Sequence, residues 1–140
     1  LRQVLPDYDI VIDATDQLEN KFLINDVCVS AEKPFVHGGI TGFSGQVMTY
    51  VPEKGPCYRC IFGEVPEDNA PAPIPVIGVT AGIIGTIQAA EAIRYLLGIP
   101  SLLTGKLLVL DGLRMQFRTV PFPHVSEHCP LHTRKGVTDL

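Results

Sequence analysis

The stretch YDIVIDATDQLENKFLINDVCVSAEKPFVHGGI (residues 8–40) has the pattern of a strand, a helix and a second strand. The apolar run at 10–12 suits a strand that is covered on both faces, as in a parallel sheet. Apolar residues at spacings of three and four predict a helix over 19–33, with Leu23 on its inward face. A second apolar run over 34–40 predicts the next strand. This order of elements predicts a βαβ unit and therefore an α/β fold.

Three further segments extend the pattern. A strand is expected at 45–51, and two strands are expected within 105–122 around an Asp-Gly turn. The segment 79–98 is long and apolar, but polar side chains interrupt it, and charges in the middle of a membrane span are costly. We therefore expect a buried core helix with one polar stripe, and no membrane partner. The residues of the stripe are Gln88, Glu91 and Arg94.

The composition fits a single domain over residues 1–140. Hydrophobic residues make up 46% and charged residues 19%, which is the balance of a soluble globular protein. A net charge of −4 with scattered basic residues argues against a nucleic-acid partner. No secretory segment is present, so we expect a cytoplasmic protein in which paired cysteines bind metal. The proline-rich segment 64–75 is expected to be a flexible crossover loop, and 134–140 a disordered tail.

Two pairs of soft ligand residues suggest a metal site. Cys57 and Cys60 form a CxxC turn, and Cys129 and His132 have the same spacing near the end of the chain. Structural zinc takes four such ligands tetrahedrally, which leaves no open position for catalysis. The interpretation is a zinc staple, against the alternative of four unrelated residues. Two other histidines could take the place of His132: His124 and His128.

Two carboxylates flank the end of the first predicted strand. Asp13 and Asp16 lie where open α/β sheets bind their ligands. Two carboxylates at this spacing can hold Mg²⁺ together with substrate phosphates. Asp16 is equally suited to cap the following helix. The residues alone leave both roles open.

Taken together, five segments resemble one family. They are DATDQLENKFLINDVCV (13–29), KPFVHGGITGFSGQV (33–47), GPCYRCIF (55–62), GIIGTIQAAEAIRYLLG (82–98) and CPLH (129–132). Their motifs and their order resemble those of the ThiF/MoeB/HesA family of ubiquitin-activating-like adenylyltransferases. The resemblance covers nearly the whole chain.

The resemblance implies a Rossmann-like mixed sheet with packed helices, stapled by a zinc knuckle, in a homodimer. It implies ATP- and Mg-dependent adenylation of the C-terminal glycine of a ubiquitin-fold sulfur-carrier protein. Asp16 matches the aspartate that holds Mg-ATP, and the match places Asp13, Lys21 and Asn25 at the cofactor. The matched zinc ligands are Cys57, Cys60 and Cys129, with His132 in the fourth place.

Several departures limit this expectation. No GxGxxG turn is present, so we expect the C-terminal part of a longer domain, inactive by itself. Gln17 replaces the family's usual Asn, Lys21 replaces Arg, and His132 replaces a Cys. The segment 69–78 has no cysteine, so no thioester is expected there. The alternative function is a non-catalytic, zinc-stapled module for carrier binding or dimerisation.

Overall fold

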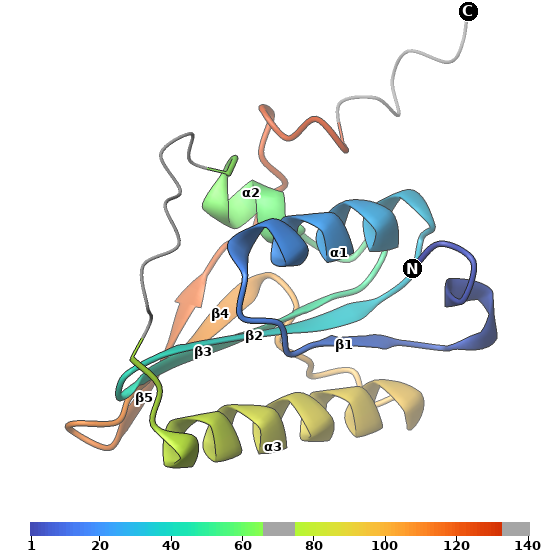
Figure 1. The fold of residues 1–140 in the computed structure, drawn as a ribbon. Helices are drawn as coiled ribbons and strands as arrows, with labels where there is room; N and C mark the ends of the chain where they lie inside the picture. The colour runs from blue at the N-terminus through green and yellow to red at the C-terminus, as the bar shows by residue number, and fades with distance from the viewer. Residues whose placement is uncertain (66–74, 133–140) are drawn as a thin grey trace, which may run out of the picture.

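A computed structural model describes residues 1–65 and 75–132. Helices cover both faces of one mixed sheet, with α1 and α2 on one face and α3 on the other (Figure 1). The expected α/β class is confirmed. Most of the predicted crossover loop (64–75) and the whole predicted tail (134–140) lie outside the described residues.

The elements follow one another in a simple order along the chain and across the sheet. They are η1 (Leu5–Asp7), β1 (Val11–Asp13), α1 (Leu18–Ser30), β2 (Phe35–Thr41), β3 (Ser44–Tyr50), α2 (Tyr58–Phe62), α3 (Gly78–Leu96), β4 (Lys106–Asp111) and β5 (Gln116–Pro121). The sheet order is β1-β2-β3-β4-β5. β1 and β2 are parallel and joined by α1, which confirms the βαβ unit. The other neighbouring pairs are antiparallel. The short helix α2 was not expected from the sequence.

Alternating side chains of β2 and β3 divide the interior into two cores. Phe35 and Met48 pack toward α1 and α2, whereas Val36 and Val47 pack toward α3. Successive strand residues point to opposite faces, so each strand supplies both cores. The two cores are the reason that helices are needed on both faces of the sheet.

Two expectations about burial are wrong. Leu23 is 55% exposed, because α1 turns Lys21 and Asn25 inward, where both side chains have hydrogen-bond partners. Ile12 is 47% exposed, and within the described ranges β1 pairs with β2 alone. The apolar run of β1 is therefore covered less completely than its sequence suggests.

The expectation that α3 is a buried core helix is also wrong, because apolar side chains such as Val79 (71% exposed) lie on its outer face. Its polar stripe faces the sheet and is partnered. The Gln88 amide donates to the carbonyl oxygens of Asp13 (2.7 Å) and Val36 (3.3 Å). The buried Glu91 carboxylate accepts from the Thr49 hydroxyl, from the backbone N–H of Leu103, and from Arg94. These bonds fix α3 to three strands and to the loop before β4, beyond what apolar packing alone specifies.

No helix within the described ranges 1–65 and 75–132 has the length and apolar character needed to cross a membrane.

Removing the Glu91 carboxylate should destabilise the fold. Glu91→Leu leaves the Thr49 hydroxyl and the Leu103 N–H buried without an acceptor, so the free energy of unfolding should fall by about 3 kcal/mol. Glu91→Gln keeps one acceptor oxygen and should lose less than half as much. Urea unfolding measures both. Equal stability of Glu91→Leu and the unsubstituted chain would contradict this role.

Candidate nucleotide site and metal centre

The carboxylate of Asp13 ends β1 and is 1% exposed. One of its oxygens accepts from the Thr15 backbone N–H (3.0 Å) and hydroxyl (2.7 Å). The other lies 2.9 Å from His37 Nδ1 and 3.3 Å from Lys21 Nζ. Burial alone would raise the pKa of Asp13, but the hydrogen bonds from His37 and Thr15 and the Lys21 charge lower it to about 2. Asp13 is therefore an ionised internal anchor.

Lys21 joins this anchor to the neighbouring strand. Besides Asp13, its ammonium donates to the carbonyl oxygen of Gly38 at 2.7 Å. Burial lowers the pKa of Lys21, and the charges of Asp13 and Asp16 oppose that effect. The side chain of this predicted cofactor ligand thus points into the protein and ties α1 to β1 and β2.

Asp16 has the opposite environment. Its residue is exposed, and helix α1 begins after Gln17, which occupies the N-cap position without a side-chain cap. The helix-cap interpretation of Asp16 is therefore wrong. Within the described part of the chain, no hydrogen bond to the Asp16 carboxylate is found. Its oxygens are free to bind a cation at the end of β1.

Asn25 lies one helical turn beyond Lys21 and is fully buried. Its side-chain oxygen accepts from the backbone N–H of Tyr58 at 2.8 Å, at the start of α2. The next residue, Asp26, accepts two hydrogen bonds from the Arg59 guanidinium, at 2.6 and 2.8 Å. Both pairs hold α2 against α1. Asn25 therefore contacts the segment between Cys57 and Cys60.

The four predicted metal ligands come together beside α2. Their ligand atoms, one from each residue, all lie within 4.8 Å of one another. Cys57 Sγ lies 3.7 Å from Cys60 Sγ and 3.7 Å from Cys129 Sγ. His132 Nδ1 lies 3.3 Å from Cys60 Sγ and 3.9 Å from Cys57 Sγ. Two ligand pairs that are far apart in the sequence, such as Cys57 and Cys129 with a separation of 72 residues, thus form one cluster.

These distances fit a tetrahedral metal ion. Zn–S bonds of about 2.3 Å at the tetrahedral angle place two sulfurs about 3.8 Å apart, and sulfur and nitrogen about 3.6 Å apart. A disulfide would need about 2.05 Å, so the sulfurs at 3.7 Å are not bonded. In the metal-free cluster a hydrogen bond from Cys57 lowers the pKa of Cys60, whereas the pKa values of Cys57 and Cys129 are raised. A bound metal would favour the thiolate form of all three. The cluster could hold a zinc ion with all four positions filled by protein.

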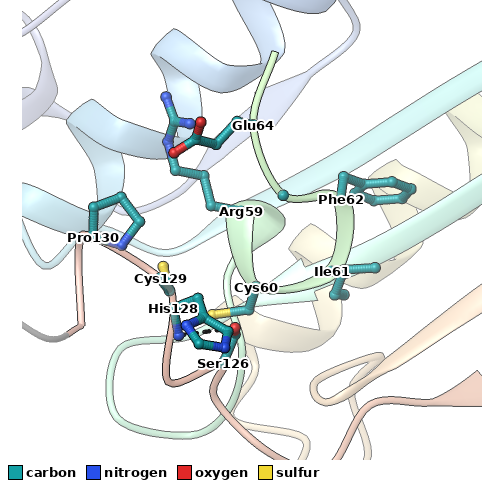
Figure 2. A pocket seen from close by; sticks show the side chains of 10 residues that line it. Arg59, Cys60, Ile61, Phe62, Glu64, Ser126, His128, Cys129 and Pro130 are labelled. Atoms are coloured by element: carbon teal, nitrogen blue, oxygen red, sulfur yellow. Dashed lines mark hydrogen bonds between the residues drawn. The ribbon is translucent and has the colours of Figure 1, made fainter. Parts of the chain in front are cut away.

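Among the described residues, His132 joins the three cysteines, whereas His124 and His128 do not. His132 contributes the fourth ligand atom, whereas His128 lies on the wall of an adjoining pocket of about 480 Å³. Figure 2 shows this pocket between α2 and the segment around Cys129. Cys28 is fully buried in the core on the side of α1, as its place on the helix predicts, and is not a member of the cluster.

Sequence reasoning missed His37 and the role of Gln88. His37 is fully buried beside Asp13, its register partner on the neighbouring strand. A signal for it existed in PFVHGGI, where one titratable residue stands in an otherwise apolar strand. The partner of that residue, however, depends on the strand register, which the sequence does not state.

Fold and site together define an α/β domain with a free aspartate at a strand end and a Cys₃His knuckle. The ThiF family model matches residues 1–131. The chain belongs to the ThiF family.

Named relatives agree with this membership, and solved structures agree with the fold. The chain is 41% identical to the SAMP-activating enzyme E1 of Haloferax volcanii, over 100% of this chain and 52% of the relative. It is 40% identical to the adenylyltransferase and sulfurtransferase MOCS3 of Culex quinquefasciatus, over 84% of this chain and 27% of the relative. The fold matches E. coli MccB with MccA-N7isoASN at a TM-score of 0.75 and 17% identity, over 94% of this chain and 43% of that one. The chain spans about half the length of the archaeal relative and less of the others.

Metal analysis should confirm the cluster. We expect about one zinc ion per purified chain. His132→Ala should lower zinc retention and the melting temperature, because it opens the coordination sphere. His128→Ala and Cys28→Ala serve as controls and should retain zinc.

The result that would contradict this assignment is a His128→Ala protein without zinc beside a His132→Ala protein that keeps it. Equal stability of the zinc-loaded and chelator-treated chains would contradict the stapling role.

Proposed function

We propose that this chain is part of an adenylyltransferase that activates the C-terminal glycine of a ubiquitin-fold carrier protein with ATP. The observation that carries the proposal is the free carboxylate of Asp16 at the end of β1 in a ThiF-family domain. Relatives named as a SAMP-activating enzyme E1 and as MOCS3 adenylyltransferases support it. Because the chain spans about half of the archaeal relative, the proposed activity belongs to a longer protein.

In this proposal Asp16 binds the magnesium ion of Mg-ATP. When bound, the ion would offset phosphate charge during attack of the carrier's carboxylate. Asp13 and Lys21 form the buried floor of the site, and their mutual charge neutralisation fixes the end of β1. Asn25 supports the cofactor site from below by holding α2 against α1.

The metal centre in this proposal is a structural zinc site. All four ligand positions come from protein side chains, so no position is open for a reacting water. The zinc would join the knuckle after β3 to the segment after β5. The zinc ion would support the fold of the site and would take no part in adenylation.

The partner in this proposal is a ubiquitin-fold sulfur carrier, and the active form is a cytoplasmic homodimer. The segment 69–78 contains no cysteine, so the carrier would remain an adenylate and would not become a thioester at that segment. The competing candidate is a carrier-binding module without catalysis. One observation favours it, since the Lys21 ammonium that replaces a family arginine points inward and away from solvent.

Asp16→Asn tests the proposal in the longer natural protein. It should lower carrier-dependent ATP–pyrophosphate exchange by about 100-fold or more, because a cation ligand is lost. Its free energy of unfolding should change by less than about 0.5 kcal/mol, since Asp16 is exposed and caps no helix. Asp9→Asn, an exposed aspartate before β1, is the control and should keep full exchange.

Full exchange activity in Asp16→Asn would contradict the assigned role of this residue. Carrier binding without any exchange by the unsubstituted protein would favour the module over the enzyme.

A further inference from the structure

We propose that His37 is a positioning residue that fixes the Asp13–Asp16 segment, and that Tyr58 of the metal-binding knuckle fixes His37 in turn. The inference rests on the proposed function, because it assigns the segment to nucleotide binding. It adds a physical connection between the metal centre and the nucleotide site. Neither His37 nor Tyr58 would touch the nucleotide.

The first link is the hydrogen bond between His37 and Asp13. The two residues are register partners on β1 and β2, and Nδ1 lies 2.9 Å from the Asp13 carboxylate. An ionised carboxylate only accepts, so Nδ1 carries the proton. Nε2 then faces the Gln46 amide at 3.4 Å as an acceptor. Burial lowers the pKa of His37, which keeps this ring neutral and in one tautomer.

The second link runs from Asp13 to Asp16. The Asp13 oxygen that does not bind His37 holds both the N–H and the hydroxyl of Thr15. This closed turn immediately precedes Asp16. Gln88 holds the Asp13 carbonyl oxygen from the opposite face of the sheet. Rotation of the Asp13 carboxylate would therefore release the turn that presents Asp16.

The third link joins His37 to the knuckle. The centroid of the Tyr58 ring lies 4.6 Å from the centroid of the His37 ring. Phe62, also in α2, has its ring centroid 6.1 Å from that of His37. Tyr58 directly follows the metal ligand Cys57, and its backbone N–H is held by Asn25. A metal held by Cys57 would therefore restrict the position of the Tyr58 ring against His37.

Substitution of His37 in the longer natural protein tests the first two links. His37→Leu removes the donor to Asp13 and should raise the KM for Mg-ATP in pyrophosphate exchange by about tenfold, with little change in kcat. His37→Asn places an amide N–H near the position of Nδ1 and should restore the KM to within about threefold. The split between KM and kcat and the rescue distinguish positioning from general loss of structure.

Thr49→Val is the matched control. Thr49 is as deeply buried as His37, but its hydroxyl bonds Glu91 on the other face of the sheet. This variant should lose stability comparably while the KM for Mg-ATP stays unchanged. An unchanged KM in His37→Leu would overturn the inference. A rise in KM in His37→Asn and Thr49→Val as large as that in His37→Leu would also overturn it.

A spectroscopic readout separates this inference from the proposed function. In ¹⁵N NMR of the zinc-loaded chain, His37 should show a protonated Nδ1 and an unprotonated Nε2. Tyr58→Leu should shift the His37 ring signals and the amides of 13–16 while leaving the Thr49 amide in place. Unchanged signals at His37 and 13–16, or a ring protonated at Nε2, would overturn the connection whether or not the protein adenylates a carrier.

Discussion

The architecture depends on a buried, ionised carboxylate at the end of β1. Asp13 accepts from groups on its own turn, on α1 and on β2, so it joins three parts of the βαβ unit at one point. A buried charge is tolerated only when such donors surround it, and removing one partner leaves the rest uncompensated. The arrangement explains why Lys21 and His37, both polar, lie inside the protein. It also leaves Asp16 as the carboxylate that solvent and ligand can reach.

The Cys₃His cluster brings together segments that are far apart in the chain, as Asp13 brings together neighbouring elements of the βαβ unit. Sixty-eight residues separate Cys60 from Cys129, and α3, β4 and β5 lie between them. The short helix α2 is held by Asn25 and Asp26 of α1 on one side and by the cluster on the other. Metal binding in such a site contributes directly to folding free energy. A metal bound by the cluster would therefore stabilise the fold by joining the segment after β3 to the segment after β5.

Local patterns allowed the βαβ unit, the β4–β5 hairpin and the two pairs of candidate ligands to be predicted, because strand, turn and ligand spacings depend on neighbouring residues. The choice of His132 over His124 and His128 needed the structure. What the sequence could not supply were pairings between distant residues. The register that sets His37 beside Asp13 is one example. The inward rotation of α1 is another, since it follows from partners for Lys21 and Asn25, and Leu23 was misplaced as a result. The choice between cap and free carboxylate at Asp16 needed the actual start of α1.

The most direct measurement is a ¹³C NMR titration of the Asp13 carboxyl in the folded chain. The account predicts that this carboxyl stays ionised until the pH approaches 2, below its ordinary value of 3.8. Because the folded-state pKa is lowered, the stabilisation is complete above pH 3.8 and is lost as the pH falls toward 2. Backbone amide signals report whether the fold persists at each pH. A midpoint at or above 3.8 in folded protein would show that burial outweighs the donors, and would contradict the account.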